Sequence, residues 1–454
     1  MTRTCFAATT PDSLGITALT PAEAEAHVDS LPAGQAAFAR AAKFSGKPGQ
    51  TVLLPADTGV GGVLVGVGDE SDPMVFRVLA LSLPEGVYHL AQLPAGMNAD
   101  LVGLAWALGG YQFTRYRQAD RAPARLVLPD GADADQVQLT AEASVLARDL
   151  VNTPAMDMGP IELADTIKTM GKTHKAKVTE VTGPALAKDY PLVHAVGMGA
   201  ERAPRLVELS WGKSGPHIAV VGKGVVFDTG GLDMKPSAGM RLMKKDMGGA
   251  AHAIALAQMI MAANLKVRLT LLVPTVENAV SGKAFRPSDV ITSRKGLTVE
   301  IDNTDAEGRL ILADALTRAE ELKPDLTLDF ATLTGAARVA LGPDVIPFYT
   351  AQDDVAAELM TSASAVADPL WRMPLWSGYK NTLDSPIADI CNMAGAGVQA
   401  GSVMAALFLQ RFAPKAWVHF DIYAWNPRGR PGYPVGAEFQ AVRAAFEMIK
   451  ARAR

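Results

Sequence analysis

The sequence of 454 residues predicts an α/β protein with two domains, a smaller N-terminal α/β domain and a C-terminal domain with a mostly parallel sheet flanked by helices. The chain exceeds the length at which one hydrophobic core usually stops growing. Short apolar runs alternate with helical patterns, as in strands joined by crossover helices. The polar, turn-rich segment 128–135 has the composition of a domain boundary. We therefore expect domains over 1–135 and 136–454.

The first elements are predicted from apolar runs and one helical pattern. Segments 51–55 and 63–67 are apolar runs of strand length, and 101–108 has helical periodicity. Beyond the boundary, a helix is expected over about 140–150. It should end at 152–154, because Pro154 disfavours the helical conformation of the residue before it.

The second domain is predicted to alternate strands with helices. The expected strands lie near 217–227, 268–274, 298–302, 326–331 and 418–422, and the expected helices near 248–263, 308–322 and 400–412. This order predicts a largely parallel sheet covered on both faces. In such sheets functional residues gather at the carboxyl ends of the strands. Asp228 closes the first strand and Asp305 follows the third, so we expect both at one edge.

The composition excludes several classes of protein. Apolar residues make up 49% of the chain and charged residues 20%, which is typical of globular proteins. The net charge of −4 gives no electrostatic reason to expect nucleic acid or an anionic membrane as the main partner. Cys5 and Cys391 are far apart, so we expect no disulfide framework and a reducing compartment. The N-terminus lacks the apolar core of a signal peptide and no apolar run reaches the ~20 residues of a membrane span, so we expect a cytoplasmic protein.

Three common catalytic motifs are absent from the sequence. The 7 His residues are never three or four apart, which excludes a helical two-His zinc motif. The glycine-rich stretches at 59–62 and 221–224 complete neither a P-loop nor a dinucleotide fingerprint. No Ser lies in a nucleophile elbow, so serine hydrolase chemistry is not expected.

Two carboxylates and a guanidinium crowd the segment 303–310. Asp305 and Glu307 are two apart, and in an extended segment they would point to one side and offer oxygens to a cation. The alternative is an acidic helix start, with Asp305 as N-cap and Glu307 complementing the helix dipole. Arg309 either binds an anion through its planar fork or pairs with a neighbouring acid.

A second group of charged residues lies upstream of this segment. Asp228 ends a predicted strand before two glycines and is either a site residue or an ordinary turn Asp. Lys223 lies within that apolar strand and either approaches a metal as a neutral amine or extends its ammonium to solvent. Lys235 either stabilises an oxyanion or is a solvated loop lysine. Asp246 either joins the site or caps the following helix.

In this order and spacing, these residues resemble the leucine aminopeptidase (cytosol aminopeptidase) family. The segments that carry the resemblance are 222–231, Lys235, 243–251 and 303–312, with further similar segments at 148–154, 331–336 and 369–376. The resemblance is strong over about 145–425 and weak in the N-terminal part, where it is limited to pieces such as 108–113. It implies that 136–454 is a catalytic metallopeptidase domain.

The resemblance also implies the composition of the site. Two adjacent divalent metal ions, Zn or Mn and possibly Mg, are implied to be held by Lys223, Asp228, Asp246, Asp305 and Glu307, with Asp228 and Glu307 bridging them. Lys235 is implied to lie beside the scissile carbonyl oxygen, and Arg309 to hold a bicarbonate ion that relays a proton. Substrate contacts are implied for Met243, Thr332, Leu333 and Gly335.

The expected function is that of a leucyl aminopeptidase-type metallo-exopeptidase, which hydrolyses an apolar, leucine-like N-terminal residue from peptides. The resemblance implies a homohexamer. Segment 419–427 is shorter than the corresponding segment of the family, which leaves the preference for leucine open. A DNA-binding or architectural role and an inactive scaffold are the alternatives. The near-neutral composition provides no basic stripe for the former, and the full set of polar site residues argues against the latter.

Overall fold

The computed structural model describes residues 5–69, 72–395 and 397–453. Residues 1–4, part of the N-terminal stretch searched for a leader, lie outside this set. Residues up to Val145 together with Asn426–Val435 form one compact unit, and Leu146–Trp425 with the residues from Gly436 onward form the other. The units divide within α5 (Ala134–Asn152), and the domain boundary near 135 stays a prediction. None of the described helices is long and apolar enough to cross a membrane.

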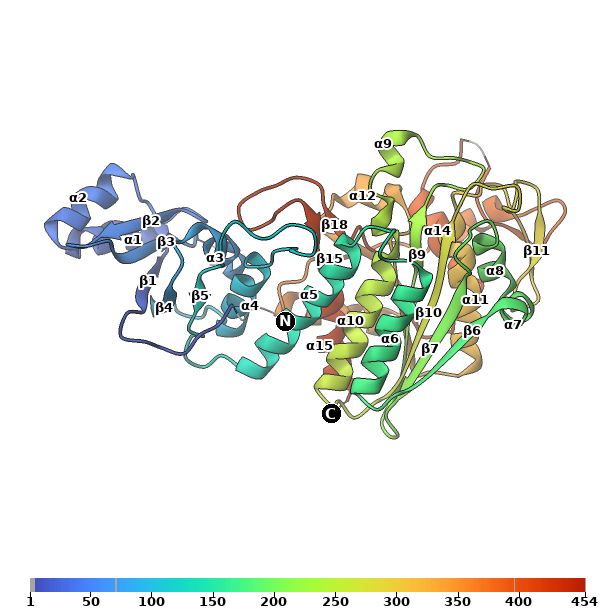
Figure 1. Ribbon diagram of the computed structural model, residues 1–454, viewed down its shortest axis with the longest axis horizontal. Coiled ribbons are helices and arrows are strands. Elements are labelled where there is room, and N and C mark those ends of the chain that lie inside the picture. Colours follow the sequence, from blue (N-terminus) through green and yellow to red (C-terminus); the bar gives the residue numbers. More distant parts are fainter. Residues whose placement is uncertain (1–4, 70–71, 396, 454) are drawn as a thin grey trace. The chain divides into compact units, whose positions relative to one another are not determined.

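The N-terminal unit is built on a five-stranded sheet in the order β2-β3-β1-β4-β5 (Figure 1). Its strands are β1 (Leu14–Leu19), β2 (Thr51–Pro55), β3 (Val60–Gly66), β4 (Val87–Gln92) and β5 (Arg125–Leu126), and its helices are α1 (Pro21–Ser30), α2 (Ala33–Ala41), η1 (Pro73–Val78), α3 (Leu79–Ser82) and α4 (Ala99–Gly109). The predicted strands at 51–55 and 63–67 and the helix at 101–108 are confirmed.

The second unit is built on a larger sheet in the order β15-β14-β17-β13-β8-β10-β7-β6, with β9 paired to β10. Its strands are β6 (Lys177–Thr182), β7 (Arg205–Trp211), β8 (His217–Gly222), β9 (Gly224–Asp228), β10 (Arg268–Asn278), β13 (Leu326–Ala331), β14 (Ile346–Tyr349), β15 (Leu370–Arg372) and β17 (Trp417–Asp421). The central strands β17, β13, β8 and β10 run parallel. The predicted mostly parallel sheet is therefore confirmed.

Two predicted strands differ from the structure. The strand expected over 217–227 is divided at Lys223 into β8 and β9, which pair with successive parts of β10. The prediction that 298–302 joins the main sheet was wrong. Residues 298–300 form β12 (Thr298–Glu300), which pairs instead with β11 (Val290–Thr292) and β16 (Ile390–Cys391). A short apolar run specifies a strand but not the sheet to which it belongs.

Helices cover both faces of the larger sheet (Figure 1). One face carries α6 (Pro160–Thr173) and α10 (Gly248–Ala262), with α15 (Val442–Arg452) packed on α10 and α13 (Asp353–Ala365) packed on α15. The other face carries α8 (Pro191–Gly197), α11 (Glu307–Glu321) and α14 (Gly401–Gln410). The remaining elements are α7 (Gly183–Asp189), α9 (Ser237–Met240), η2 (Met243–Met247), α12 (Gly335–Leu341), η3 (Ser377–Leu383), β18 (Trp425–Asn426) and β19 (Gly436–Ala437).

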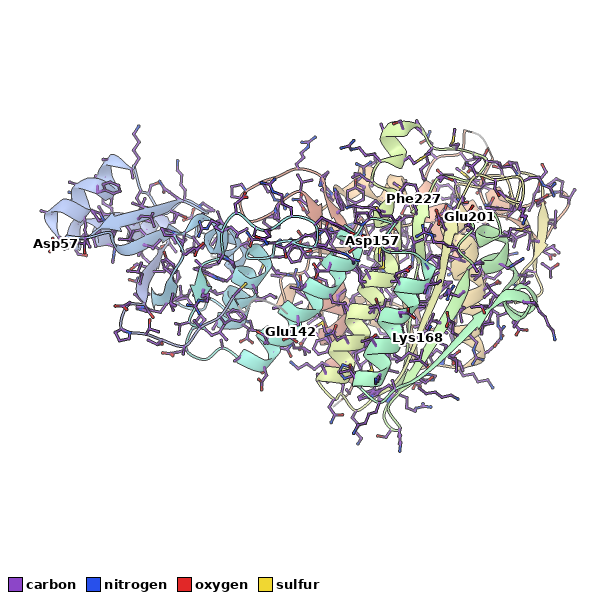
Figure 2. The ribbon with its side chains drawn as sticks, viewed as in Figure 1. Asp57, Glu142, Asp157, Lys168, Glu201 and Phe227 are labelled. Carbon is purple, nitrogen blue, oxygen red and sulfur yellow. The ribbon has the colours of Figure 1, made fainter. Side chains whose placement is uncertain are left out.

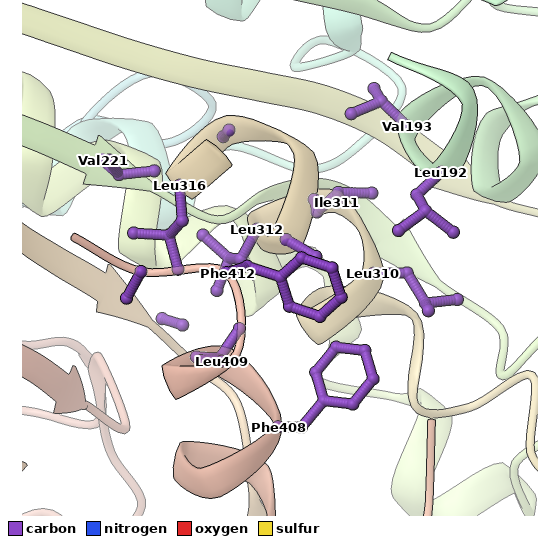
Figure 3. Close-up of a cluster of buried hydrophobic side chains, with 14 of the residues drawn as sticks. Leu192, Val193, Val221, Leu310, Ile311, Leu312, Leu316, Phe408, Leu409 and Phe412 are labelled. Atoms are coloured by element: carbon purple, nitrogen blue, oxygen red, sulfur yellow. The ribbon is translucent and has the colours of Figure 1, made fainter. Parts of the chain in front are cut away.

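The buried core under α11 explains the position of that helix. Leu310, Leu312 and Leu316 of α11 pack with Phe408 and Phe412, which come from α14 and the residues after it (Figure 3). All five side chains are buried, so the first turn of α11 is held firmly against the sheet.

The outer helices carry charged side chains instead. Lys168 of α6, labelled in Figure 2, pairs with Asp165 and Glu180 at 3.0 and 2.8 Å.

Candidate metal centre

The strand order brings the predicted site residues to one edge of the larger sheet. Asp228 is the last residue of β9 and Asn278 is the last residue of its neighbour β10. Thr332 follows β13 directly, and Asp421 ends β17 beside it. These are the carboxyl ends of the parallel strands, where the sequence predicted the site.

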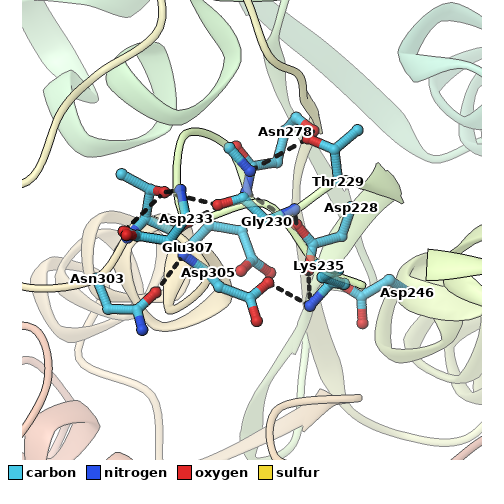
Figure 4. Close-up of polar contacts among 12 residues, drawn as sticks. Asp228, Thr229, Gly230, Asp233, Lys235, Asp246, Asn278, Asn303, Asp305 and Glu307 are labelled. Atoms are coloured by element: carbon cyan, nitrogen blue, oxygen red, sulfur yellow. Dashed lines mark hydrogen bonds and ion pairs between the residues drawn. The ribbon is translucent and has the colours of Figure 1, made fainter. Parts of the chain in front are cut away.

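Three carboxylates converge at this edge. One oxygen each of Asp228, Asp305 and Glu307 lies within 4.8 Å of the others (Figure 4). Asp228 and Glu307 are buried, whereas the Asp305 side chain is one-third exposed, at 33%. Three acidic groups at this separation repel one another unless a cation lies between them, so the cluster has the geometry of a cation site.

The ammonium group of Lys223 lies between the carboxylates of Asp246 and Glu307. Its Nζ lies 2.8 Å from both Asp246 Oδ2 and Glu307 Oε1 and donates to Thr332 O at 3.1 Å. Burial by itself lowers the pKa of Lys223, but the negative charges of Asp246 and Glu307 outweigh it and raise the pKa above the ordinary value. The alternative that Lys223 extends to solvent was therefore wrong.

Gly308 makes this position of Lys223 possible. A Cβ atom at residue 308 would lie 2.5 Å from Lys223 Cε and 2.7 Å from its Nζ. Contacts that short do not occur between real side chains, so a Cβ atom here would force the end of the Lys223 side chain to shift. The glycine in the segment 303–310 thus leaves room for a lysine more than eighty residues away in the sequence.

Lys235 lies on the opposite side of the three-carboxylate cluster. Its Nζ is 2.8 Å from Asp228 Oδ2 and also contacts Asp305 Oδ1 (Figure 4). Burial by itself lowers the pKa of Lys235, but the negative charges of Asp228 and Glu307 outweigh burial. The pKa of Lys235 therefore lies above its ordinary value. The solvated-loop alternative for Lys235 was wrong, since its side chain is only 15% exposed and paired with two acids.

The two helix-cap alternatives do not describe the structure. The residue that precedes α11 is Ala306, which has no capping side chain, and Asp305 lies one residue earlier. Likewise Met247 precedes α10, and Asp246 instead accepts a hydrogen bond from Thr332 Oγ1 at 2.7 Å. The expected extended segment was also wrong, because Glu307 is the first residue of α11; the two carboxylates meet because the chain turns between them.

The electrostatics of the site favour a bound cation. Burial raises the pKa of Glu307 to about 8 and that of Asp305 to about 6, and repulsion from Asp228 adds to both shifts. Asp246 Oδ2 and Glu307 Oε1 contact Lys223 but accept no hydrogen bond of good geometry from the described residues. Four carboxylates thus share two ammonium groups. A donor set of carboxylate oxygens with one amine fits Zn, Mn or Mg.

Arg309 is buried near this cluster, and no carboxylate pairs with it among the described residues. Its Nη1 donates to Asn392 O at 2.7 Å, and its Nε is buried with no partner among the described residues. Burial lowers the pKa of Arg309 to about 10. No ion pair found among the described residues includes Arg309, so of the two alternatives direct pairing with a neighbouring acid does not describe the structure. Its guanidinium keeps capacity for an anion.

Several residues that support the site were missed in the sequence. Asn278 Nδ2 donates to Asp228 Oδ1 at 2.8 Å and to Thr304 O at 3.1 Å. Thr304 in turn is linked to the next loop, since its N–H donates to Asp233 Oδ2 at 2.7 Å and its hydroxyl accepts from Asp233 N at 2.9 Å. An Asn at the end of an apolar strand was the only signal available, and it does not identify its partner.

The residues expected to contact substrate surround the same edge. Thr332 is bonded to Asp246, and Leu333 follows it. Met243 is the first residue of η2, which carries Asp246, and Gly335 is the first residue of α12. Thr332, Leu333 and Gly335 therefore follow the carboxyl end of β13, and Met243 lies on the same short helix as Asp246.

The chain matches two family models. The catalytic domain of the cytosol aminopeptidase family matches residues 145–444, and the M17 aminopeptidase N-terminal domain matches residues 14–129. A probable cytosol aminopeptidase of Leifsonia xyli subsp. xyli is 38% identical over 435 residues, which cover 89% of this chain and 87% of the relative. One from Xylella fastidiosa is 43% identical over 297 residues, covering 63% of this chain and 59% of the relative.

Solved structures resemble the whole chain. The crystal structure of a cytosol aminopeptidase from Coxiella burnetii has a TM-score of 0.94 and 42% identity and covers 99% of this chain and 100% of its own. The bottromycin maturation enzyme BotP in complex with Mn has a TM-score of 0.86 and 32% identity, covering 98% and 100%. A tomato leucine aminopeptidase mutant has a TM-score of 0.85 and 27% identity, covering 98% and 95%.

Proposed function

The chain belongs to the cytosol aminopeptidase family and is a metal-dependent exopeptidase, and from this premise we propose that it removes apolar N-terminal residues from peptides. The observation that carries the proposal is the cluster of Asp228, Asp305 and Glu307 beside the buried Lys223. Hydrolysis of a peptide bond at neutral pH needs an activated water and a stabilised oxyanion, and this edge supplies groups for both.

The ligands that we propose for two divalent metal ions are Lys223, Asp228, Asp246, Asp305 and Glu307. Metal ions held by these residues would lower the pKa of a bound water and would interact with the free α-amine of the substrate. The requirement for that amine restricts cleavage to the N-terminal residue. Lys223 has to lose a proton to act as a ligand, and its close contact with Glu307 and Asp246 places its nitrogen among the other donors. The similar enzyme BotP was solved in complex with Mn, which supports manganese as one candidate metal.

Lys235 is proposed to stabilise the tetrahedral oxyanion. Its Nζ lies at the rim of the carboxylate cluster, 2.8 Å from Asp228, and its loop is fixed because Lys235 N donates to Thr229 O at 2.9 Å. The turn before it requires glycine, since Gly230 has φ of 88°. A cation held in this way needs little reorganisation when negative charge develops on the scissile carbonyl.

Arg309 is proposed to hold a bicarbonate ion that accepts and returns the proton of the attacking water. The support is chemical: a buried guanidinium with an unpartnered Nε and no acidic partner among the described residues can bind a planar anion. No side chain in the cluster is then needed as a general base, because its carboxylates serve as ligands.

Substrate selectivity is proposed to come from Met243, Thr332, Leu333 and Gly335. An apolar pocket distinguishes similar side chains only modestly, so several apolar N-terminal residues should be cleaved. Within the segment 419–427 the ring of Tyr423 lies beside Lys245, whose Nζ is 5.0 Å from the ring centroid. We propose that this segment sets how far leucine is preferred over other residues.

A homohexamer and a cytoplasmic location complete the proposal. Trp371, Trp376 and Ile387 are large apolar side chains exposed by 58–62%, in the unit that carries the site, and an interface would cover them. We do not propose the DNA-binding alternative, because neither the net charge of −4 nor the matched family models support it.

The test combines metal content with activity. The protein is stripped with a chelator, reloaded with Mn, Zn or Mg, and assayed on a panel of aminoacyl amides and on the same substrates with a blocked α-amine. We expect no turnover in the stripped protein, recovery with Mn or Zn, and no cleavage of blocked substrates. Full activity of metal-free protein, or equal cleavage of blocked substrates, would contradict the proposal.

A further inference from the structure

The segment 332–335 is held from two sides. On one side Thr332 is bonded to the metal centre, since its Oγ1 donates to Asp246 Oδ1 at 2.7 Å and its carbonyl accepts from Lys223 Nζ at 3.1 Å. On the other side lies Asp421, a residue that the proposed reaction does not use. One oxygen of its carboxylate accepts the N–H of both Leu333 and Thr334, each at 3.0 Å.

The carboxylate of Asp421 is itself held in place. Its second oxygen accepts from Thr334 Oγ1 at 2.6 Å and from Ser402 Oγ at 3.1 Å, and the Ser402 hydroxyl also contacts Tyr349. Asp421 is only 2% exposed and is the last residue of β17, hydrogen-bonded into the sheet next to β13. Four donors thus fix a buried carboxylate for which no ion pair with a cation is found among the described residues.

The planar trans peptide bond fixes the direction in which the carbonyl groups of Thr332 and Leu333 point. In a trans peptide the C=O of one residue points opposite to the N–H of the next. Because the N–H of Leu333 points at Asp421, the C=O of Thr332 must point away from it, and this carbonyl is indeed found at Lys223. The N–H of Thr334 also points at Asp421, so the C=O of Leu333 is turned away from Asp421 as well.

We propose that Asp421 is a positioning residue that turns the backbone carbonyls of Thr332 and Leu333 toward the metal side of the segment, so that the Leu333 carbonyl accepts an N–H of the peptide substrate. The inference rests on the proposed aminopeptidase function and deepens it. A short connection after a strand has no regular ladder to fix its peptide planes, and one carboxylate that accepts two consecutive amides supplies that restraint.

The substitution Asp421→Ala removes both acceptors and frees the two peptide planes. We expect KM for a peptide substrate to rise roughly 10- to 100-fold, the scale on which small misplacements of a binding group act, with kcat changed much less, because a contact made equally in ground and transition states acts on KM. Asp421→Asn should restore KM, since its amide oxygen can accept both N–H groups and its NH₂ can face the two hydroxyls. Metal content should equal that of the parent in both variants.

The matched control is Asp368→Asn. Asp368 is another buried carboxylate that accepts two backbone amides, from Ala441 and Ala444 at 3.1 Å each, but none of the partners found for it belongs to the site. It should change stability without changing KM. Should Asp421→Ala fail to fold, Thr334→Val removes a single donor to Asp421 at nearly constant volume and should raise KM in the same direction by a smaller factor.

Hydrogen exchange of the Leu333 and Thr334 amides gives a readout that does not need turnover. It should accelerate in Asp421→Ala and stay slow in Asp368→Asn. Unchanged exchange, or faster exchange with an unchanged KM, would overturn the positioning role, as would a loss of bound metal in Asp421→Ala. If the reloaded parent cleaves no peptide, the proposed function fails, while the exchange result still decides whether Asp421 holds these two amides.

Discussion

At the scale of single residues, the site depends on buried charges that compensate one another. Lys223 and Glu307 are both almost completely buried, and removing one partner of such a pair typically costs about 3–5 kcal/mol because the other charge is left uncompensated. Asp246 shares the same ammonium. In the metal-free protein the lysine ammonium groups therefore balance the charge of the carboxylates, a role that we propose for metal ions in the loaded enzyme. Substitutions should consequently change metal content and turnover together.

Glu307→Ala should abolish turnover and lower bound metal while the chain stays folded. The substitution removes a buried carboxylate from the cluster but little apolar packing. Metal content by mass spectrometry and rates on leucinamide are measured in the same sample. The matched control is Glu320→Ala on the same helix, because Glu320 lies near the surface and pairs with Lys295 at 2.8 Å. Near-normal rates in Glu307→Ala would show that Glu307 serves only the start of α11.

Lys235→Ala should lower kcat by roughly 10²–10³, the usual range for losing one oxyanion donor, with both metals retained. The measurement is kcat at saturating metal. Lys168→Ala is the control, since Lys168 also lies between two carboxylates but on the outer surface of α6. An equal loss of rate in both variants, or an unchanged kcat in Lys235→Ala, would contradict the assignment.

Arg309→Ala should slow turnover, leave metal content unchanged and make the rate less sensitive to added bicarbonate than in the parent. The reason is that we propose Arg309 to contact the anion and not the metal. Arg443→Ala is a close control, because Arg443 is also buried with an Nε that has no partner among the described residues. Metal loss with unchanged bicarbonate dependence would show instead that Arg309 orients Glu307.

At the scale of elements, the sequence predicted those parts of the fold that depend on local pattern. Helices α10 and α11 lie within one residue of the predicted ranges, because long apolar periodicity and glycine-rich starts are local signals. Strands β6 and β7 were missed. Neither strand has a clear alternation of buried and exposed residues, and the antiparallel pairing of β7 with β10 is decided by residues distant in sequence.

The candidate site was predicted as a set of residues but not as a geometry. The motif spacing identified Asp228, Asp305 and Glu307, and the carboxyl-end rule placed the first two at one edge. Sequence could not show that Gly308 leaves room for Lys223, or that Asn278 joins two loops. Both contacts depend on tertiary packing. Neither a glycine nor an asparagine indicates from the sequence alone which residue it will contact.

Asn278→Ala tests the connection between these loops. Asn278 directs Asp228 through Oδ1 and holds the carbonyl of Thr304, so its loss should weaken metal binding by about 10- to 100-fold, as for other groups that orient a ligand. Metal affinity is measured by competition with a chromogenic chelator. Thr275→Val on the same strand is the control, since Thr275 is equally buried and its hydroxyl has no partner among the described residues. Equal metal affinities in the two variants would mean that Asp228 keeps its orientation without Asn278.

At the scale of the whole molecule, several large apolar side chains are exposed on the unit that carries the site. Trp371, Trp376 and Ile387 are more than half exposed, and all belong to the unit that carries the site. Contiguous apolar patches on a protein surface mark interaction sites, whereas single exposed apolar side chains are common. In a closed ring of identical subunits one such patch is covered in every copy, which a monomer cannot achieve.

We therefore expect a homohexamer at micromolar concentration, assembled through the catalytic unit. Light scattering of the parent should give six times the mass of one chain. Trp376→Asp places a charge on an apolar side chain that is 62% exposed, so it should shift the mass toward smaller species if that surface is an interface. Phe38→Asp is the control in the other unit, where Phe38 is 50% exposed. A parent that is a stable monomer contradicts the assembly. If both variants lose the hexamer equally, the N-terminal unit also takes part in the contacts. A charge at an exposed apolar position weakens assembly only where that position is buried against a partner.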